Sequence, residues 1–103
     1  MSDILMIGLV RFHTVSHEVE SGGKTLHLTT LEARTLSFLA LHANEVCTFG
    51  HIAKEAYGFD NYDDGDSALI PICIRHLRQK LEPDPRNPVY ILTVPGVGYR
   101  LVL

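Results

Sequence analysis

Residues 67–81 constrain the fold of this chain most, because they describe one amphipathic helix with a sharp end. Apolar residues recur in this stretch at steps of four, three and four: Ile70, Ile74, Leu77 and Leu81. This spacing places them on one face of a helix, which should pack on the core. The next seven residues, EPDPRNP, hold three prolines and cannot continue the helix. Two β-rich stretches follow, joined by a glycine turn, and they predict a β-hairpin directly after the helix.

The other face of the same helix mixes basic and apolar side chains. It carries Leu69, Ile72, Cys73, Arg75, His76, Gln79 and Lys80, with Arg78 at its edge. In a DNA major groove, Arg and Lys can bind phosphates and guanine, while small apolar groups can contact the thymine methyl. The helix pattern alone does not decide between DNA and solvent, because any surface helix has a charged face.

The distribution of charge favours the DNA interpretation more than the total charge does. The 103 residues have a net charge of −3. Residues 1–65 hold four basic and nine acidic groups, whereas residues 66–103 hold five basic and three acidic groups. Affinity for a polyanion depends on such a local field, although a few charges either way would remove the contrast.

The first two thirds of the chain predict a small sheet followed by two helices. Residues 4–28 are rich in β-formers broken by turns, and Gly22-Gly23 suits a two-residue hairpin, so we expect three or four antiparallel strands. Thr29 and Glu32 form a capping box that opens a helix over about 30–43, and Thr48 can cap a second over 49–57. The third helix is expected over 68–81. Pro71 requires it to begin within 68–70 or to have a distorted first turn.

Three segments resemble the OmpR/PhoB-type effector domains of bacterial response regulators. They are LTTLEARTLSFL (28–39), NEVCTFGHIAKEAYG (44–58) and IRHLRQKLEPDPRNPVYILTVPGVGYRL (74–101). The resemblance implies one α+β domain over 1–103, a winged helix-turn-helix. It would combine a three-helix core with the N-terminal antiparallel sheet (4–28) and a C-terminal β-hairpin wing (89–103).

The same resemblance implies a cytoplasmic, sequence-specific DNA-binding domain of a bacterial transcription regulator, without cofactor or catalysis. Helix three would read the major groove and the wing would reach the minor groove. The loop 58–66 would be able to touch RNA polymerase, and two copies could bind paired half-sites. The implied contact residues are Leu69, Ile72, Cys73, Arg75, His76, Arg78 and Lys80 on the helix, and Thr93, Pro95 and Gly96 on the wing.

Two positions depart from this family. His76 stands where the family often has a base-reading arginine, and an imidazole is charged only when protonated. Pro95 stands where the family usually places Arg or Lys in the minor groove. These departures leave a second interpretation open, in which the domain contacts RNA polymerase or another regulator and binds DNA weakly.

Other readings of single residues also stay open. Arg75 or Arg78 could pair with an acidic neighbour such as Glu82, and Ile72 and Cys73 could be packing groups. The acidic residues of 58–66 lack the ligand order of a calcium loop, and no catalytic motif appears. Cys47 and Cys73 are expected to be reduced thiols. Within these 103 residues no receiver domain, signal peptide or membrane-spanning stretch is expected, and the sequence is compatible with an excised effector domain or with a complete small regulator.

Overall fold

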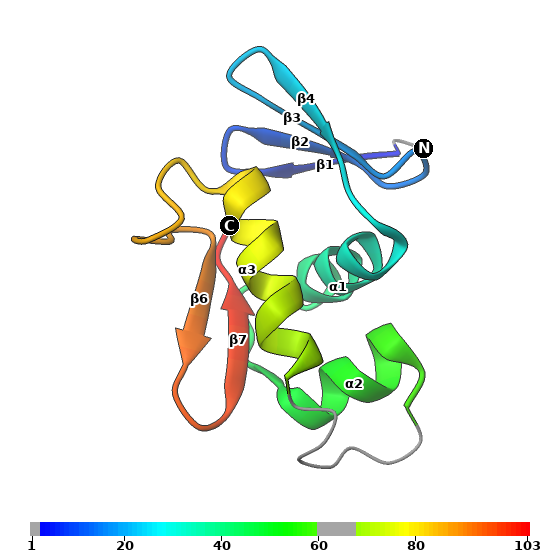
Figure 1. Cartoon of the computed structure of the whole chain (residues 1–103), viewed down its shortest axis with the longest axis vertical. Coiled ribbons are helices and arrows are strands. Elements are labelled where there is room, and N and C mark those ends of the chain that lie inside the picture. The colour runs from blue at the N-terminus through cyan, green and yellow to red at the C-terminus, as the bar shows by residue number, and fades with distance from the viewer. Residues whose placement is uncertain (1–2, 60–67) are drawn as a thin grey trace.

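The computed structural model describes residues 3–59 and 68–103, which begin with a four-stranded antiparallel sheet. Its strands follow the chain in order: β1 (Ile4–Ile7), β2 (Val10–His13), β3 (Glu18–Ser21) and β4 (Lys24–His27). Gly22 and Gly23 turn the last hairpin with φ angles of 57° and 80°, which only glycine adopts without cost. In Figure 1 this sheet lies above the helices.

Two capped helices follow the sheet. α1 (Thr30–Leu41) begins with the predicted capping box, in which Glu32 accepts from the backbone of Thr29 and the Thr29 side chain accepts from the backbone of Glu32. It ends two residues before the predicted boundary. α2 (Phe49–Tyr57) occupies the predicted range, with Thr48 as its N-cap and Gly58 in the left-handed region at its C-cap.

The third helix, α3 (Leu69–Leu81), begins within the predicted range. Ala68 is the N-cap, so Pro71 is the third helical residue. The first helical hydrogen bond runs from the Ile72 N–H to the Ala68 carbonyl at 3.3 Å. Pro71 therefore lies in the first turn, where its missing N–H removes no helical bond.

A second sheet forms the wing, and it contains one strand that the sequence did not predict. β6 (Ile91–Val94) and β7 (Gly98–Leu101) form the hairpin, and β5 (Cys47–Thr48) pairs antiparallel with β7 to give the order β5-β7-β6. A Cβ at position 98 would lie 1.9 Å from the Cys47 carbonyl oxygen, so glycine is required for this pairing.

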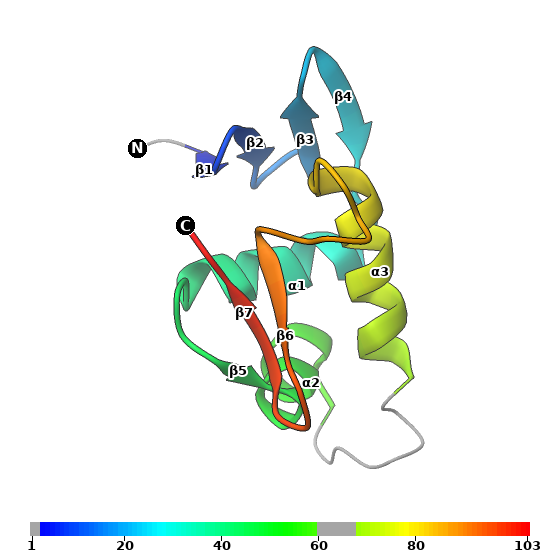
Figure 2. The same cartoon turned by 90° about the vertical axis from the view of Figure 1, so that its left-hand side faces the viewer.

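The core lies where the elements meet. Its side chains on α3 are the four apolar residues at helical spacing, Ile70, Ile74, Leu77 and Leu81, together with Cys73. Phe12 and Val19 contribute from the N-terminal sheet, and Ile91 and Leu101 from the wing. α3 is thereby packed from one side, as Figure 2 shows with α3 at the right edge and the other helices to its left. In residues 3–59 and 68–103, no helix is long and apolar enough to cross a membrane.

Candidate nucleic-acid interface

The outward side of α3 forms a ridge, defined here as Leu69, Ile72, Arg75, His76 and Gln79. Leu69 and Ile72 are 45% and 46% exposed. Arg75 and Gln79 are exposed one turn apart, and the His76 side chain is 45% exposed beside them. Within the described residues, no hydrogen bond or ion pair involves the Arg75 guanidinium. The ridge therefore presents one extended cation flanked by apolar and amide groups.

Cys73 does not lie on this ridge, so its predicted exposed position is wrong. The side chain is 7% exposed, and its Sγ lies 3.5 Å from Oγ1 of Thr35 on α1. Position 73 follows Ile70 by three residues and precedes Leu77 by four, which turns it toward the core. Of the two readings that the sequence left open, packing is the one observed.

Arg78 joins α3 to the wing. Its Nε and Nη2 donate to the Ile91 carbonyl at 3.1 and 2.8 Å, and Nη2 donates to Oγ1 of Thr93 at 2.9 Å. The guanidinium also lies 5.8 Å from the centre of the Tyr99 ring. The expected alternative, an ion pair with Glu82, does not form. These bonds engage the guanidinium within the protein, and the predicted DNA contact of Arg78 remains a proposal.

Glu82 instead fixes the start of the wing. Its carboxylate is buried and accepts the backbone N–H groups of Val89, Tyr90 and Ile91 at 2.8–3.2 Å. Charge-assisted bonds of this kind are among the stronger hydrogen bonds in proteins. Glu82 and Arg78 thus hold β6 against the end of α3 from two directions.

The other basic groups of α3 face α1. The Lys80 ammonium donates to Glu32 Oε1 at 2.6 Å and to the His27 carbonyl at 3.0 Å. His76 Nδ1 lies 3.7 Å from Glu32 Oε2. Lys80 was expected on the exposed face, but its ammonium is held at the start of α1.

The tip of the wing is exposed and lacks a cation. Pro95, Gly96 and Val97 are all exposed, and Gly96 has a φ of 74°, which suits glycine. The Val97 carbonyl accepts the N–H of Phe49 at 3.1 Å, which ties the tip to the start of α2. Thr93 is exposed one residue before the turn. The tip of the wing can therefore offer backbone groups, and Thr93 beside it a hydroxyl, but the tip itself has no charged side chain to offer a partner.

One ridge residue was missing from the predicted contacts. Gln79 lies one turn after Arg75 on the same exposed line, and a glutamine amide can bind adenine through two hydrogen bonds. The four-residue step from Arg75 was the available signal. The loop 58–66, expected to face RNA polymerase, lies outside the described residues except for Gly58 and Phe59.

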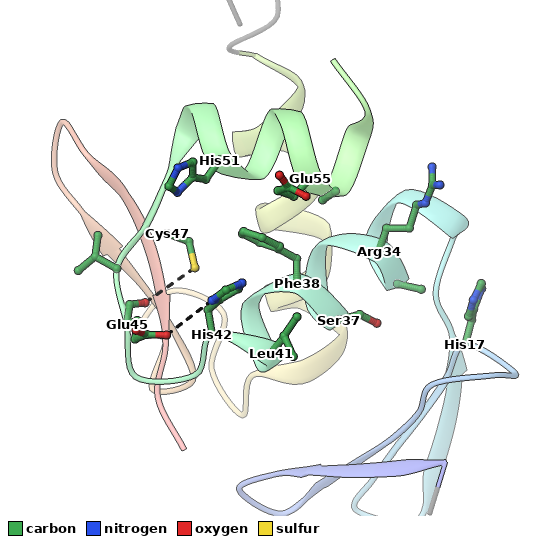
Figure 3. Close-up of a pocket in the computed structure, with 13 residues that line it drawn as sticks. His17, Arg34, Ser37, Phe38, Leu41, His42, Glu45, Cys47, His51 and Glu55 are labelled. Carbon is green, nitrogen blue, oxygen red and sulfur yellow. Dashed lines mark hydrogen bonds and ion pairs between the residues drawn. The ribbon is translucent and has the colours of Figure 1, made fainter. Parts of the chain in front are cut away.

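A separate cavity of about 740 Å³ lies between α1, α2 and the link to β5 (Figure 3). Phe38 and Leu41 supply apolar surface, while Arg34, Glu45 and Glu55 place charges of both signs around it. Among the described residues that line this cavity, none comes from α3 or from the β6–β7 hairpin. Its mixed charges match no single class of ligand. In the described part of the chain, no cluster of three or more His, Cys, Asp or Glu side chains is arranged to hold a metal ion.

Comparison with known families identifies the domain. The family model described as "Transcriptional regulatory protein, C terminal" matches residues 23–101. The chain belongs to this family. The chain is similar to the sensory transduction protein RegX3 of Mycobacterium tuberculosis, with 36% identity over 102 residues, or 98% of this chain and 44% of RegX3. The chain thus spans less than half of the length of this relative.

Solved structures agree with this assignment. The RstA DNA-binding domain of Klebsiella pneumoniae, in complex with the RstA box, is 27% identical, with a TM-score of 0.81 and 96% of both chains covered. The DNA-binding domain of CpxR from E. coli is 30% identical, with a TM-score of 0.79 and 98% and 97% of the two chains covered. The predicted α+β winged helix-turn-helix fold is confirmed, as is the resemblance to OmpR/PhoB-type effector domains.

Proposed function

We propose that this chain binds double-stranded DNA in a sequence-specific manner and that it acts in a bacterial transcription regulator. α3 would lie in the major groove and the wing at the adjacent minor groove. The observation that carries the proposal is the exposed ridge of α3, which projects Arg75 beside apolar and amide groups on an otherwise packed helix. Family membership and the RstA domain in complex with the RstA box support it.

Each ridge residue has a contact that suits its chemistry. The Arg75 fork can bind guanine through two hydrogen bonds or can bind a phosphate. Gln79 can bind adenine, and Leu69 and Ile72 can pack on thymine methyl groups. His76 can donate a hydrogen bond to a base or a phosphate. Together these contacts would read sequence along one face of the duplex.

The wing would mainly position the domain. The Thr93 hydroxyl can donate to a phosphate, and the exposed Pro95-Gly96 turn can approach the backbone closely. Arg78 would act through Ile91 and Thr93 by setting the angle between wing and helix. The cytoplasmic location, pairing of two copies on half-sites and contact of the loop 58–66 with RNA polymerase belong to the same proposal. No catalytic step is part of it.

Selection from a pool of random duplexes tests the proposal. If the protein binds DNA in a sequence-specific manner, the duplexes that it retains should share a sequence motif. Gln79→Ala should relax one position of that motif, because it removes an amide from the ridge. Arg34→Gln is the matched control on α1, and it should leave the motif unchanged. Retained duplexes without any common sequence would contradict the proposal.

A protein-interaction module remains the second candidate, because two observations favour it. Lys80 and Arg78 are engaged within the protein, and the wing tip carries Pro95 in place of a cation. DNA binding should weaken steeply with added salt, whereas a protein contact through Leu69 and Ile72 should respond little. A salt titration of each interaction therefore separates the two functions.

A further inference from the structure

Glu32 connects the start of α1 with the basic side of α3. Its side chain is almost fully buried, with 4% of the residue exposed. One carboxylate oxygen accepts the Thr29 N–H at 3.0 Å and the Lys80 ammonium at 2.6 Å. The other lies 3.7 Å from Nδ1 of His76. A single carboxylate thus faces two basic residues that are one helical turn apart on α3.

This arrangement opposes a move of Lys80 toward a phosphate. The carboxylate lies in the first turn of α1, where the helix dipole and the Thr29 N–H stabilise a negative charge. The short bond to Lys80 joins two charged groups at a mostly buried site, where electrostatic interactions are stronger than in water. If the ammonium left for DNA, the buried carboxylate would lose its main partner.

We propose that Glu32 limits the positive charge that α3 presents to DNA, by holding the Lys80 ammonium against α1. The inference rests on the proposed DNA-binding function and adds a specificity-determining residue to it. Phosphate contacts raise affinity for every sequence alike, whereas base contacts distinguish sequences. By withholding Lys80 from the phosphate backbone, Glu32 leaves recognition to the ridge residues Arg75 and Gln79 and keeps non-specific binding weak.

Glu32→Gln tests the proposal with little effect on the helix start. Glutamine can replace glutamate in a capping box, so the acceptor for the Thr29 N–H is retained while the negative charge is removed. The assay is fluorescence anisotropy of the chain on a labelled duplex of random sequence, at pH 7.5 and from 50 to 200 mM salt. Released Lys80 should steepen the slope of log K against log salt by about one, so the variant should lose roughly fourfold more affinity across this range.

Two further variants decide whether Lys80 causes the steeper salt slope of Glu32→Gln. Lys80→Gln alone should leave the slope of the wild-type chain unchanged, because the ammonium is already engaged. Glu32→Gln combined with Lys80→Gln should return the slope to the wild-type value. Circular dichroism of each variant shows whether the helices are intact. If Glu32→Gln is poorly folded, the slope of Lys80→Gln still tests the proposal.

The outcomes separate this inference from the function on which it rests. If the wild-type chain shows no salt-dependent DNA binding even at 50 mM salt, the proposed function fails. If the wild-type chain binds, but folded Glu32→Gln has an equal or shallower slope, only the role of Glu32 fails. The role of Glu32 would also fail if Lys80→Gln had a salt slope shallower by about one than that of the wild-type chain, because Lys80 would then already contact DNA.

Discussion

Glu82 should contribute more to stability than its place in a proline-rich surface segment suggests. Its buried carboxylate accepts three backbone N–H groups, from Val89, Tyr90 and Ile91, at distances of 2.8–3.2 Å. Hydrogen bonds to a charged group contribute about 1.5–3 kcal/mol each, and water can replace part of this at the half-exposed positions. We therefore predict that Glu82→Ala lowers the free energy of unfolding by about 3 kcal/mol.

Thermal and urea unfolding, followed by circular dichroism, measure this effect. For a domain of this size, a loss of about 3 kcal/mol should lower the melting temperature by roughly 12–24 °C. Asp84→Ala is the matched control, because its carboxylate lies two residues further along and is fully exposed. The reasoning is refuted if Glu82→Ala destabilises the chain no more than Asp84→Ala does, since the three N–H groups would then not depend on Glu82.

Three further predictions concern the wing and the proline-rich segment that precedes it. Arg78→Met should lower the free energy of unfolding by about 1–3 kcal/mol and should also lower DNA affinity, because it removes the hydrogen bonds to the wing. Chemical denaturation measures the first effect and fluorescence anisotropy the second. Unchanged values of both would contradict the role of Arg78. Gly98→Ala should destabilise the chain by more than about 2 kcal/mol because its Cβ would meet the Cys47 carbonyl, and a melting temperature equal to that of the wild-type chain would argue against the β5–β7 pairing. Hydrogen bonds from the side chain of Asn87 and the backbone of Arg86 lower the pKa of Asp84, so its carboxylate stabilises the fold above the ordinary aspartate pKa, and this contribution is lost as pH falls through the lowered value. NMR titration should find that Asn87→Ala raises the pKa of Asp84; an unchanged value would exclude the Asn87 bond as its cause.

Local signals in the sequence predicted the elements well. The capping box at Thr29, the Gly22-Gly23 turn and the constraint from Pro71 each depend on interactions within a few residues. Such interactions form largely independently of the rest of the fold, so they can be predicted from the sequence. The two-residue strand β5 was not predicted, because it pairs with β7, about fifty residues away.

The candidate site was harder to predict because the orientation of a long side chain depends on distant partners. The spacing identified the core face of α3 but did not place Cys73 correctly at the edge between the two faces. Nor does the sequence indicate that Lys80 meets Glu32, or that Arg78 meets the Ile91 carbonyl. These partners come from α1 and the wing, so only the tertiary structure reveals which cations of α3 remain exposed.

The salt dependence of DNA binding by Arg75→Gln tests the central claim most directly. Anisotropy on a selected duplex should give a slope of log K against log salt that is shallower by about one than that of the wild-type chain, together with reduced preference over a scrambled duplex. Arg34→Gln, which removes the same charge from α1, should leave both values unchanged. Equal slopes and equal preferences for the wild-type chain and Arg75→Gln would contradict a DNA-reading role for the exposed ridge of α3.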